Sequence, residues 1–101
     1  MIFLLNSSTD ICEMILISET HQYNKKWVAE RTLAKNLLRE IEHFLKEHHF
    51  VWNDISALGV YKGPGSYTGL RIGITVMNTL ADSLAISIVG VNGEDWPKKA
   101  L

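Results

Sequence analysis

The sequence has little of what usually marks secreted, disulfide-rich or nucleic-acid-binding proteins. It contains one cysteine and two prolines in 101 residues, and its formal net charge is −1. The single cysteine, Cys12, excludes an internal disulfide and suits a reducing compartment. A surface that grips phosphates normally makes a domain basic, so the near-zero charge argues against direct contact with nucleic acid.

Long hydrophobic runs are also missing. No apolar stretch approaches the ~20 residues of a membrane span. The start, Met1–Leu5, has neither the basic residues nor the apolar length of a signal peptide. We therefore expect a cytoplasmic protein with no membrane contact. The length predicts one domain, and a hydrophobic share of 47% with a charged share of 21% is ordinary for a globular protein.

The glycines are concentrated in residues 63–73, which read Gly-Pro-Gly-Ser-Tyr-Thr-Gly-Leu-Arg-Ile-Gly. Between a strand and a helix, such a turn can hold a phosphate or let another element approach closely. A P-loop needs Lys and then Ser or Thr after its last glycine, but Leu70 and Arg71 follow Gly69. The dinucleotide fingerprint would need a glycine at Thr68. We expect a tight turn in which Thr68 is the N-cap of the following helix.

This stretch resembles the GPGS(F/Y)TG(L/V)RIG signature of the TsaB (YeaZ) family, a partner subunit in bacterial tRNA threonylcarbamoyladenosine synthesis. Residues 4–9 resemble the opening L-D-T-S-T strand and turn of that family. Residues 29–32 resemble the start of its first helix, and residues 54–60 resemble its D-L-D-A-L-G-V strand. The resemblance ends near Val91 and so covers almost the whole chain.

The resemblance implies a ribonuclease-H-like, actin-like fold. Family members usually carry two such units, and this chain resembles the first unit alone. We therefore expect one domain over residues 1–91 and a short C-terminal tail over residues 92–101, with the second domain of the family absent.

Hydrophobic periodicity predicts an α/β chain with five strands and two helices. The strands are expected at residues 2–7, 11–18, 21–30, 55–61 and 86–91, and the helices at residues 32–48 and 69–84. With right-handed crossovers, this order predicts a mixed sheet of order 3-2-1-4-5, strand 2 antiparallel, with both helices on one face. Because the first strands carry apolar residues on both sides, the second face also needs cover from a partner or another domain.

The second helix is apolar nearly all round, so we expect its outer side to contact another protein. Glycines four residues apart would let a partner helix approach closely. The predicted interface consists of Leu37, Ile41, Gly69, Ile72, Gly73, Val76 and Leu80. The alternative is a helix tucked under the first helix and the loops, with scattered exposed apolar residues.

No pattern indicates catalysis or a metal site. His43 and His48 are five residues apart, which separates them by about 140° around a helix, so they do not form an H-x-x-x-H metal motif. Asn6 stands where the actin-like fold uses an Asp to help hold a magnesium-bound nucleotide, and asparagine is a poorer ligand for that cation. We predict no catalytic residue, no metal and no cofactor.

Arg71 is the one charged residue within the signature loop. The loop residues that define the signature are Gly63, Pro64, Gly65, Ser66, Thr68 and Arg71. We expect Arg71 to anchor a carboxylate, Asp54 or Glu30, because bidentate Arg–carboxylate pairs are common anchors. The alternative is that it reaches a partner or ligand.

The resemblance implies a non-catalytic dimerisation subunit. It would pair with a TsaD-type catalytic subunit, or with itself, and support formation of N6-threonylcarbamoyladenosine at position 37 of tRNA. A TsaE-type ATPase can join such a complex. Two alternatives stay open: an ATPase-like or peptidase-like enzyme half, and a shortened homodimerising paralogue without a tRNA role.

Overall fold

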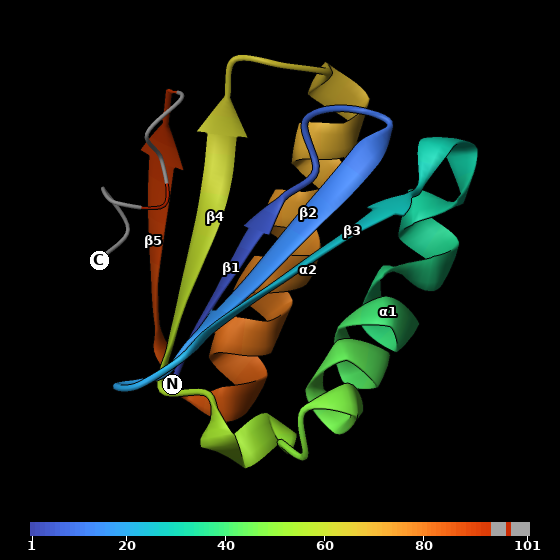
Figure 1. The fold of residues 1–101 in the computed structure, drawn as a ribbon. Helices are drawn as coiled ribbons and strands as arrows, with labels where there is room; N and C mark the ends of the chain where they lie inside the picture. Colours follow the sequence, from blue (N-terminus) through green and yellow to red (C-terminus); the bar gives the residue numbers. More distant parts are fainter. Residues whose placement is uncertain (94–96, 98–101) are drawn as a thin grey trace.

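The chain folds into five strands and two main helices (Figure 1). The computed structural model describes residues 1–93 and residue 97. The strands are β1 (Ile2–Asn6), β2 (Ile11–Ile17), β3 (Gln22–Val28), β4 (Ala57–Gly63) and β5 (Ser87–Asn92). The helices are α1 (Leu33–Glu47) and α2 (Tyr67–Leu84), with short 3-10 helices η1 (Glu30–Thr32) and η2 (Trp52–Asp54). Most of the predicted tail, residues 94–96 and 98–101, lies outside the described residues.

The sheet has the order β3-β2-β1-β4-β5, which confirms the predicted order. β2 runs antiparallel to both of its neighbours, β1 and β3. β4 runs parallel to both β1 and β5. This arrangement follows from three strands joined by short turns and then two right-handed crossovers.

The fourth strand begins two residues later than predicted. The residues before it form the 3-10 turn η2, in which the Asp54 carboxylate accepts a hydrogen bond from the Val51 backbone N–H at 2.8 Å. The Ser56 N–H then donates to the Met1 carbonyl at 2.7 Å. Local turn bonds therefore hold residues 51–55, and Ser56 then bonds to Met1 before the chain pairs with β1 at Ala57.

Both helices lie behind the sheet in Figure 1, on the same face, as predicted. The strands contribute alternate residues to this core, as expected when successive side chains point to opposite faces. α1 contributes residues spaced by three or four, and α2 contributes fewer. The members from β1 and the helices are Phe3, Leu5, Leu33, Leu37, Ile41, Phe44, Leu45, Met77 and Ala81.

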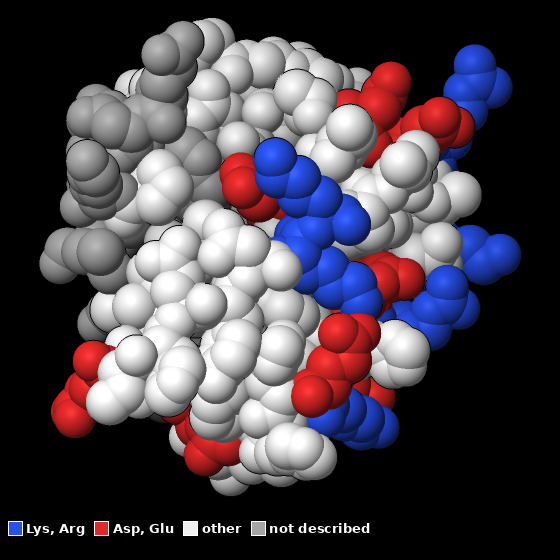
Figure 2. All heavy atoms as spheres, in the orientation of Figure 1, with Lys and Arg blue, Asp and Glu red and all other residues white. Residues whose placement is uncertain are grey.

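The other face of the sheet is also apolar. Leu4, Ile15, Tyr61 and Val91 form a second buried cluster there, with Ile2, Ile17 and Leu70 packed against it. Figure 2 views this side and shows a broad uncharged area over the sheet, with charged side chains gathered toward the β3 side. The strands are therefore apolar on both faces, as the sequence predicted.

Cys12 lies in the core on β2 and is fully buried. Burial raises the pKa of its thiol from the ordinary 9.0 to about 12, which outweighs the lowering effect of the Trp27 side chain beside it. Because the thiolate is the reactive form, Cys12 is held in its inert form.

We expect Cys12 to resist alkylation at pH 8 in the folded protein and to react readily in guanidinium chloride.

The raised pKa also predicts a pH effect on stability. The contribution of Cys12 to the free energy of unfolding is unaffected below about pH 9 and falls between pH 9 and 12, by roughly 1.4 kcal/mol per pH unit. Chemical denaturation of the native chain and of Cys12→Ala at several pH values measures this effect. The free energy of unfolding should fall less steeply with pH in the variant, because the variant lacks the Cys12 thiol. Equal alkylation rates in the folded and unfolded chain would contradict the burial of Cys12 in the core.

Neither α1 nor α2, the long helices of the described residues, is long and apolar enough to cross a membrane.

Candidate interaction surface and the glycine-rich turn

The glycine-rich turn, residues 63–69, leads from β4 into α2. Gly63 has a φ of +135°, a region that side chains rarely tolerate, and the Gly63–Pro64 bond is cis. Ser66 is the N-cap, and its hydroxyl accepts a bond from the Gly69 N–H at 3.5 Å. The prediction that Thr68 caps the helix is wrong, because the helix begins at Tyr67 and Thr68 already lies inside it.

Two glycines of the signature, Gly69 and Gly73, lie against the turn that follows β1. A Cβ on Gly69 would overlap the Ser7 carbonyl oxygen, and a Cβ on Gly73 would overlap the Ser7 hydroxyl. The Ser7 hydroxyl donates to the Gly69 carbonyl at 2.7 Å. The Ser66 N–H donates to the Ser8 carbonyl at 2.7 Å. Of the two uses considered for this stretch, the geometry therefore supports close approach of another element of the same chain.

This arrangement corrects part of the predicted interface. Gly69 and Gly73 face Ser7 and are not available to a partner helix. Leu37 and Ile41 are fully buried in the main core, so they cannot meet a partner either. The regularly spaced stripe of α1 is the side that packs on the sheet, and a stripe can cover only one surface.

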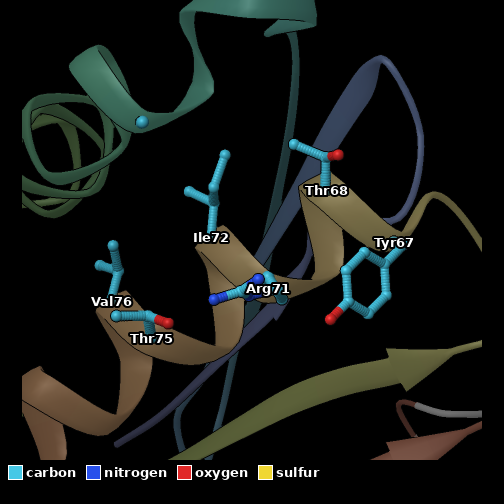
Figure 3. A pocket seen from close by; sticks show the side chains of 7 residues that line it. Tyr67, Thr68, Arg71, Ile72, Thr75 and Val76 are labelled. Carbon is cyan, nitrogen blue, oxygen red and sulfur yellow. The ribbon is translucent and has the colours of Figure 1, made fainter.

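The remaining predicted interface residues, Ile72, Val76 and Leu80, are half-buried and follow one another at four-residue spacing on α2. Ile72 and Val76 line a groove of about 450 Å³ between α2 and the start of α1, and Leu80 follows one turn later on α2. In Figure 3, Ile72 and Val76 point toward the α1 side of this groove. The residues that line the groove are Ala34, Tyr67, Thr68, Arg71, Ile72, Thr75 and Val76.

Sequence reasoning missed Ala34, Tyr67 and Thr75 as lining residues. Ala34 sits one turn before Leu38, which is 52% exposed, and both lie outside the core stripe of α1. The sequence could have indicated this, because Ala34 and Leu38 are apolar residues four positions apart that do not belong to the buried stripe of α1. They give α1 a short exposed apolar strip, of which Ala34 lines the groove.

Arg71 does not form the predicted ion pair. Its guanidinium carbon lies 5.8 Å from the centre of the Tyr67 ring, within the range of a cation–π contact. Asp54 is engaged by the Val51 N–H. Within residues 1–93, the ion pairs are Lys25–Glu47 at 2.6 Å and Lys46–Glu42 at 3.3 Å. The expected bond from Arg71 to Asp54 or Glu30 is therefore wrong.

Asn6 and His48 have local partners. The Asn6 Oδ1 accepts a bond from the Ser8 N–H at 2.9 Å, which holds the turn between β1 and β2. The His48 ring stacks on Tyr23 with centroids 4.1 Å apart. In the part of the chain that the structure describes, no three His, Cys, Asp or Glu residues are placed to hold a metal ion.

The chain resembles proteins of tRNA modification. The model of the family described as "TsaD: tRNA N6-adenosine threonylcarbamoyltransferase" matches residues 17–96. The tRNA threonylcarbamoyladenosine biosynthesis protein TsaB of Bacillus subtilis is 39% identical over 80 residues, which covers 79% of this chain and 33% of that protein.

Solved structures agree with the sequence matches. YeaZ from Pseudomonas aeruginosa superposes with a TM-score of 0.84 at 30% identity and covers 90% of this chain and 43% of that chain. The chain thus spans less than half the length of the relatives it matches. T. thermophilus RuvC, solved with a Holliday junction substrate, has a TM-score of 0.58 at 9% identity. That likeness concerns the fold alone, and it confirms the predicted ribonuclease-H-like architecture.

Proposed function

Because the chain belongs to the TsaB/YeaZ family, we propose that it is a non-catalytic partner subunit in the formation of N6-threonylcarbamoyladenosine at position 37 of tRNA. It acts by docking on a TsaD-type catalytic subunit in the cytoplasm, with residues 1–91 as the docking unit. A TsaE-type ATPase can join the same complex.

The observation that carries this proposal is the flank of α2. A helix that lies on one face of a sheet normally turns a polar side outward. α2 does so with the exposed residues Arg71, Asn78 and Asp82. Beside that polar side, a half-buried flank of Ile72, Val76 and Leu80 continues the apolar surface past the buried residues Met77 and Ala81. The groove beside them gives a partner helix a concave apolar seat, which is how an amphipathic helix is commonly recognised.

Val76→Asp is expected to weaken binding to the purified TsaD-type subunit by about 10–100-fold, because it places a charge where the two proteins exclude water. Asn78→Asp is the matched control: it adds the same charge on an exposed part of α2 that does not line the groove. Calorimetric titration of wild type and both variants gives the dissociation constants, and circular dichroism checks that each variant is folded.

Two results would count against the proposal in different ways. If wild type does not bind the catalytic subunit, the assigned role is wrong. If wild type and a folded Val76→Asp variant bind equally well, the role stands and the docking surface lies elsewhere. A reconstituted modification reaction that proceeds equally fast without this chain would also contradict the role.

A further inference from the structure

We propose that Asn92 and Gly93 form a site of spontaneous deamidation, and that the isoaspartate formed there releases the end of β5 from the glycine-rich turn. The inference does not depend on the proposed function, because it concerns the start of that turn, at Gly63, and not the groove along α2.

Asn92–Gly93 is the one place in the sequence where a glycine follows an asparagine. Deamidation needs the backbone nitrogen of the next residue to reach the asparagine side chain, and a side chain on that next residue hinders the approach. Glycine has no Cβ and the widest range of backbone angles, so it hinders the approach least. The other five asparagines precede residues with side chains, namely Ser7, Lys25, Leu37, Asp54 and Thr79.

The reaction uses only these two residues and water. The backbone nitrogen of Gly93 attacks Cγ of Asn92 and closes a succinimide ring. The bond from Cγ to Nδ2 breaks, and ammonia leaves with the proton that the Gly93 nitrogen gives up. Water then opens the ring. Opening at Cγ gives aspartate, whereas opening at the main-chain carbonyl carbon gives isoaspartate, in which the backbone runs through Cγ.

The structure places both reacting groups at a weakly held end of the sheet. β5 is an edge strand beside β4 (Figure 1), and Asn92 is its last residue and is exposed. The Gly93 N–H donates to the Gly63 carbonyl at 3.3 Å, which is longer than the usual range of about 2.7–3.2 Å. The pairing of β4 with β5 is irregular between Tyr61 and Gly63, next to this bond. Such an end opens locally at little cost, and the opening makes the Gly93 nitrogen available for attack.

Asn6 is the asparagine with the next smallest following residue, Ser7, and its surroundings protect it. Asn6 is half-buried, and its Oδ1 accepts a bond from the Ser8 N–H at 2.9 Å. Ser7 is fully buried, and its hydroxyl donates to the Gly69 carbonyl at 2.7 Å. An attack by the Ser7 nitrogen on Asn6 would have to break these bonds, so the folded chain reacts at Asn92 first.

The isoaspartate product changes the backbone where β5 meets the glycine-rich turn. Asn92 pairs with Gly63, whose φ of +135° begins the turn into α2. Isoaspartate adds a carbon to the backbone between residues 92 and 93, which displaces the Gly93 N–H from the Gly63 carbonyl. Aspartate keeps the length of the backbone, so it adds a negative charge and keeps this bond.

The first test ages the purified, folded chain in mildly alkaline buffer, in which the peptide nitrogen reacts faster. Ion-exchange chromatography separates the more acidic products, peptide mapping locates them, and methylation by a protein isoaspartate methyltransferase measures isoaspartate. We expect Asn92 to react about tenfold faster than Asn6, because fewer contacts have to open. Asn92→Gln should lose most of the acidic product, since the longer side chain closes a larger ring more slowly. Asn78→Gln, the matched change at an exposed residue of α2, should age like wild type.

Two results of this test would overturn the inference. If Asn92 reacts in the chain unfolded by urea and does not react in the folded chain, the fold protects the site. If the acidic product of the folded chain persists in Asn92→Gln, the reaction takes place at another residue.

A second measurement tests the release of β5 from the turn. The isoaspartate form, purified from aged wild type, should unfold at a temperature about 2–4 °C below that of fresh wild type, because the bond from Gly93 to Gly63 is lost. Asn92→Asp carries the same added charge on a backbone of normal length, and its unfolding temperature should fall by less than about half as much. An isoaspartate form as stable as fresh wild type, or an equal loss in Asn92→Asp, would show that the altered backbone does not release the turn.

Discussion

Alanine at Gly69 or at Gly73 is expected to lower the free energy of unfolding by about 1–2 kcal/mol. In a helix, alanine is favoured over glycine by about 1 kcal/mol, so propensity alone would make both variants more stable. The added Cβ would, however, overlap the Ser7 carbonyl oxygen at the first site and the Ser7 hydroxyl at the second. Overpacking of this kind typically costs about 1–3 kcal/mol and sometimes more, which outweighs the propensity gain. Urea denaturation of each variant measures the difference.

The identity of the overlapping atom allows a sharper test with Ser7→Gly. That change removes the hydroxyl and the Cβ that a Gly73→Ala side chain would meet, but it leaves the backbone carbonyl that a Gly69→Ala side chain would meet. In a double-mutant cycle, Ser7→Gly should therefore couple favourably with Gly73→Ala, by about 1–2 kcal/mol, and should not couple with Gly69→Ala. Equal rescue of both variants, or of neither, would contradict the packing described here.

Gly90→Ala is the control for these substitutions. Gly90 lies on β5, and a Cβ there would meet only carbon atoms of the Lys62 side chain, which is flexible and exposed. We expect it to change stability by less than about 0.5 kcal/mol. A loss as large as that at Gly73 would show that glycine itself, rather than its neighbour, matters in this chain.

The order of elements could be read from the sequence because each step depends on chemistry that is local or general. Alternation and apolar runs marked the strands, and the four-residue spacing of Leu33, Leu37 and Ile41 marked α1. The handedness of crossovers then determined the strand order. The predicted ends of helices and strands were less accurate where a side-chain hydrogen bond in a turn determines where the element begins. The Ser66 hydroxyl starts α2 two residues earlier than predicted, and the Asp54 carboxylate delays the start of β4.

The interaction surface was harder to predict because sequence spacing does not say what a residue faces. The glycines of the signature indicated a close approach, and the structure has one, but Ser7 of the same chain is the approaching group. The partner of Arg71 depended on where Asp54 lies in three dimensions, and a local bond to the Val51 N–H engages Asp54 instead. The expectation that α2 is apolar nearly all round is wrong, because its exposed residues, such as Asn78 and Asp82, are polar. The flank of Ile72, Val76 and Leu80 stays a prediction.

Leu37→Ala is expected to lower the free energy of unfolding by about 3 kcal/mol, whereas Leu38→Ala, one residue further along α1, should change it by less than about 0.5 kcal/mol. Leu37 is fully buried in the main core, and truncating such a leucine removes apolar contacts and leaves a cavity. Leu38 is 52% exposed, so its truncation removes little buried surface. Chemical denaturation of the two variants measures this contrast.

The same pair distinguishes a core residue from an interface residue. If Leu37 contacted a partner, its truncation would weaken binding to the catalytic subunit and leave the stability of the free chain unchanged. The structure predicts the reverse: at a temperature where Leu37→Ala is fully folded, its affinity for the catalytic subunit should equal that of wild type. If Leu37→Ala left the stability unchanged and weakened binding, Leu37 would be an interface residue. In that case a different side of α1 would have to pack on the sheet.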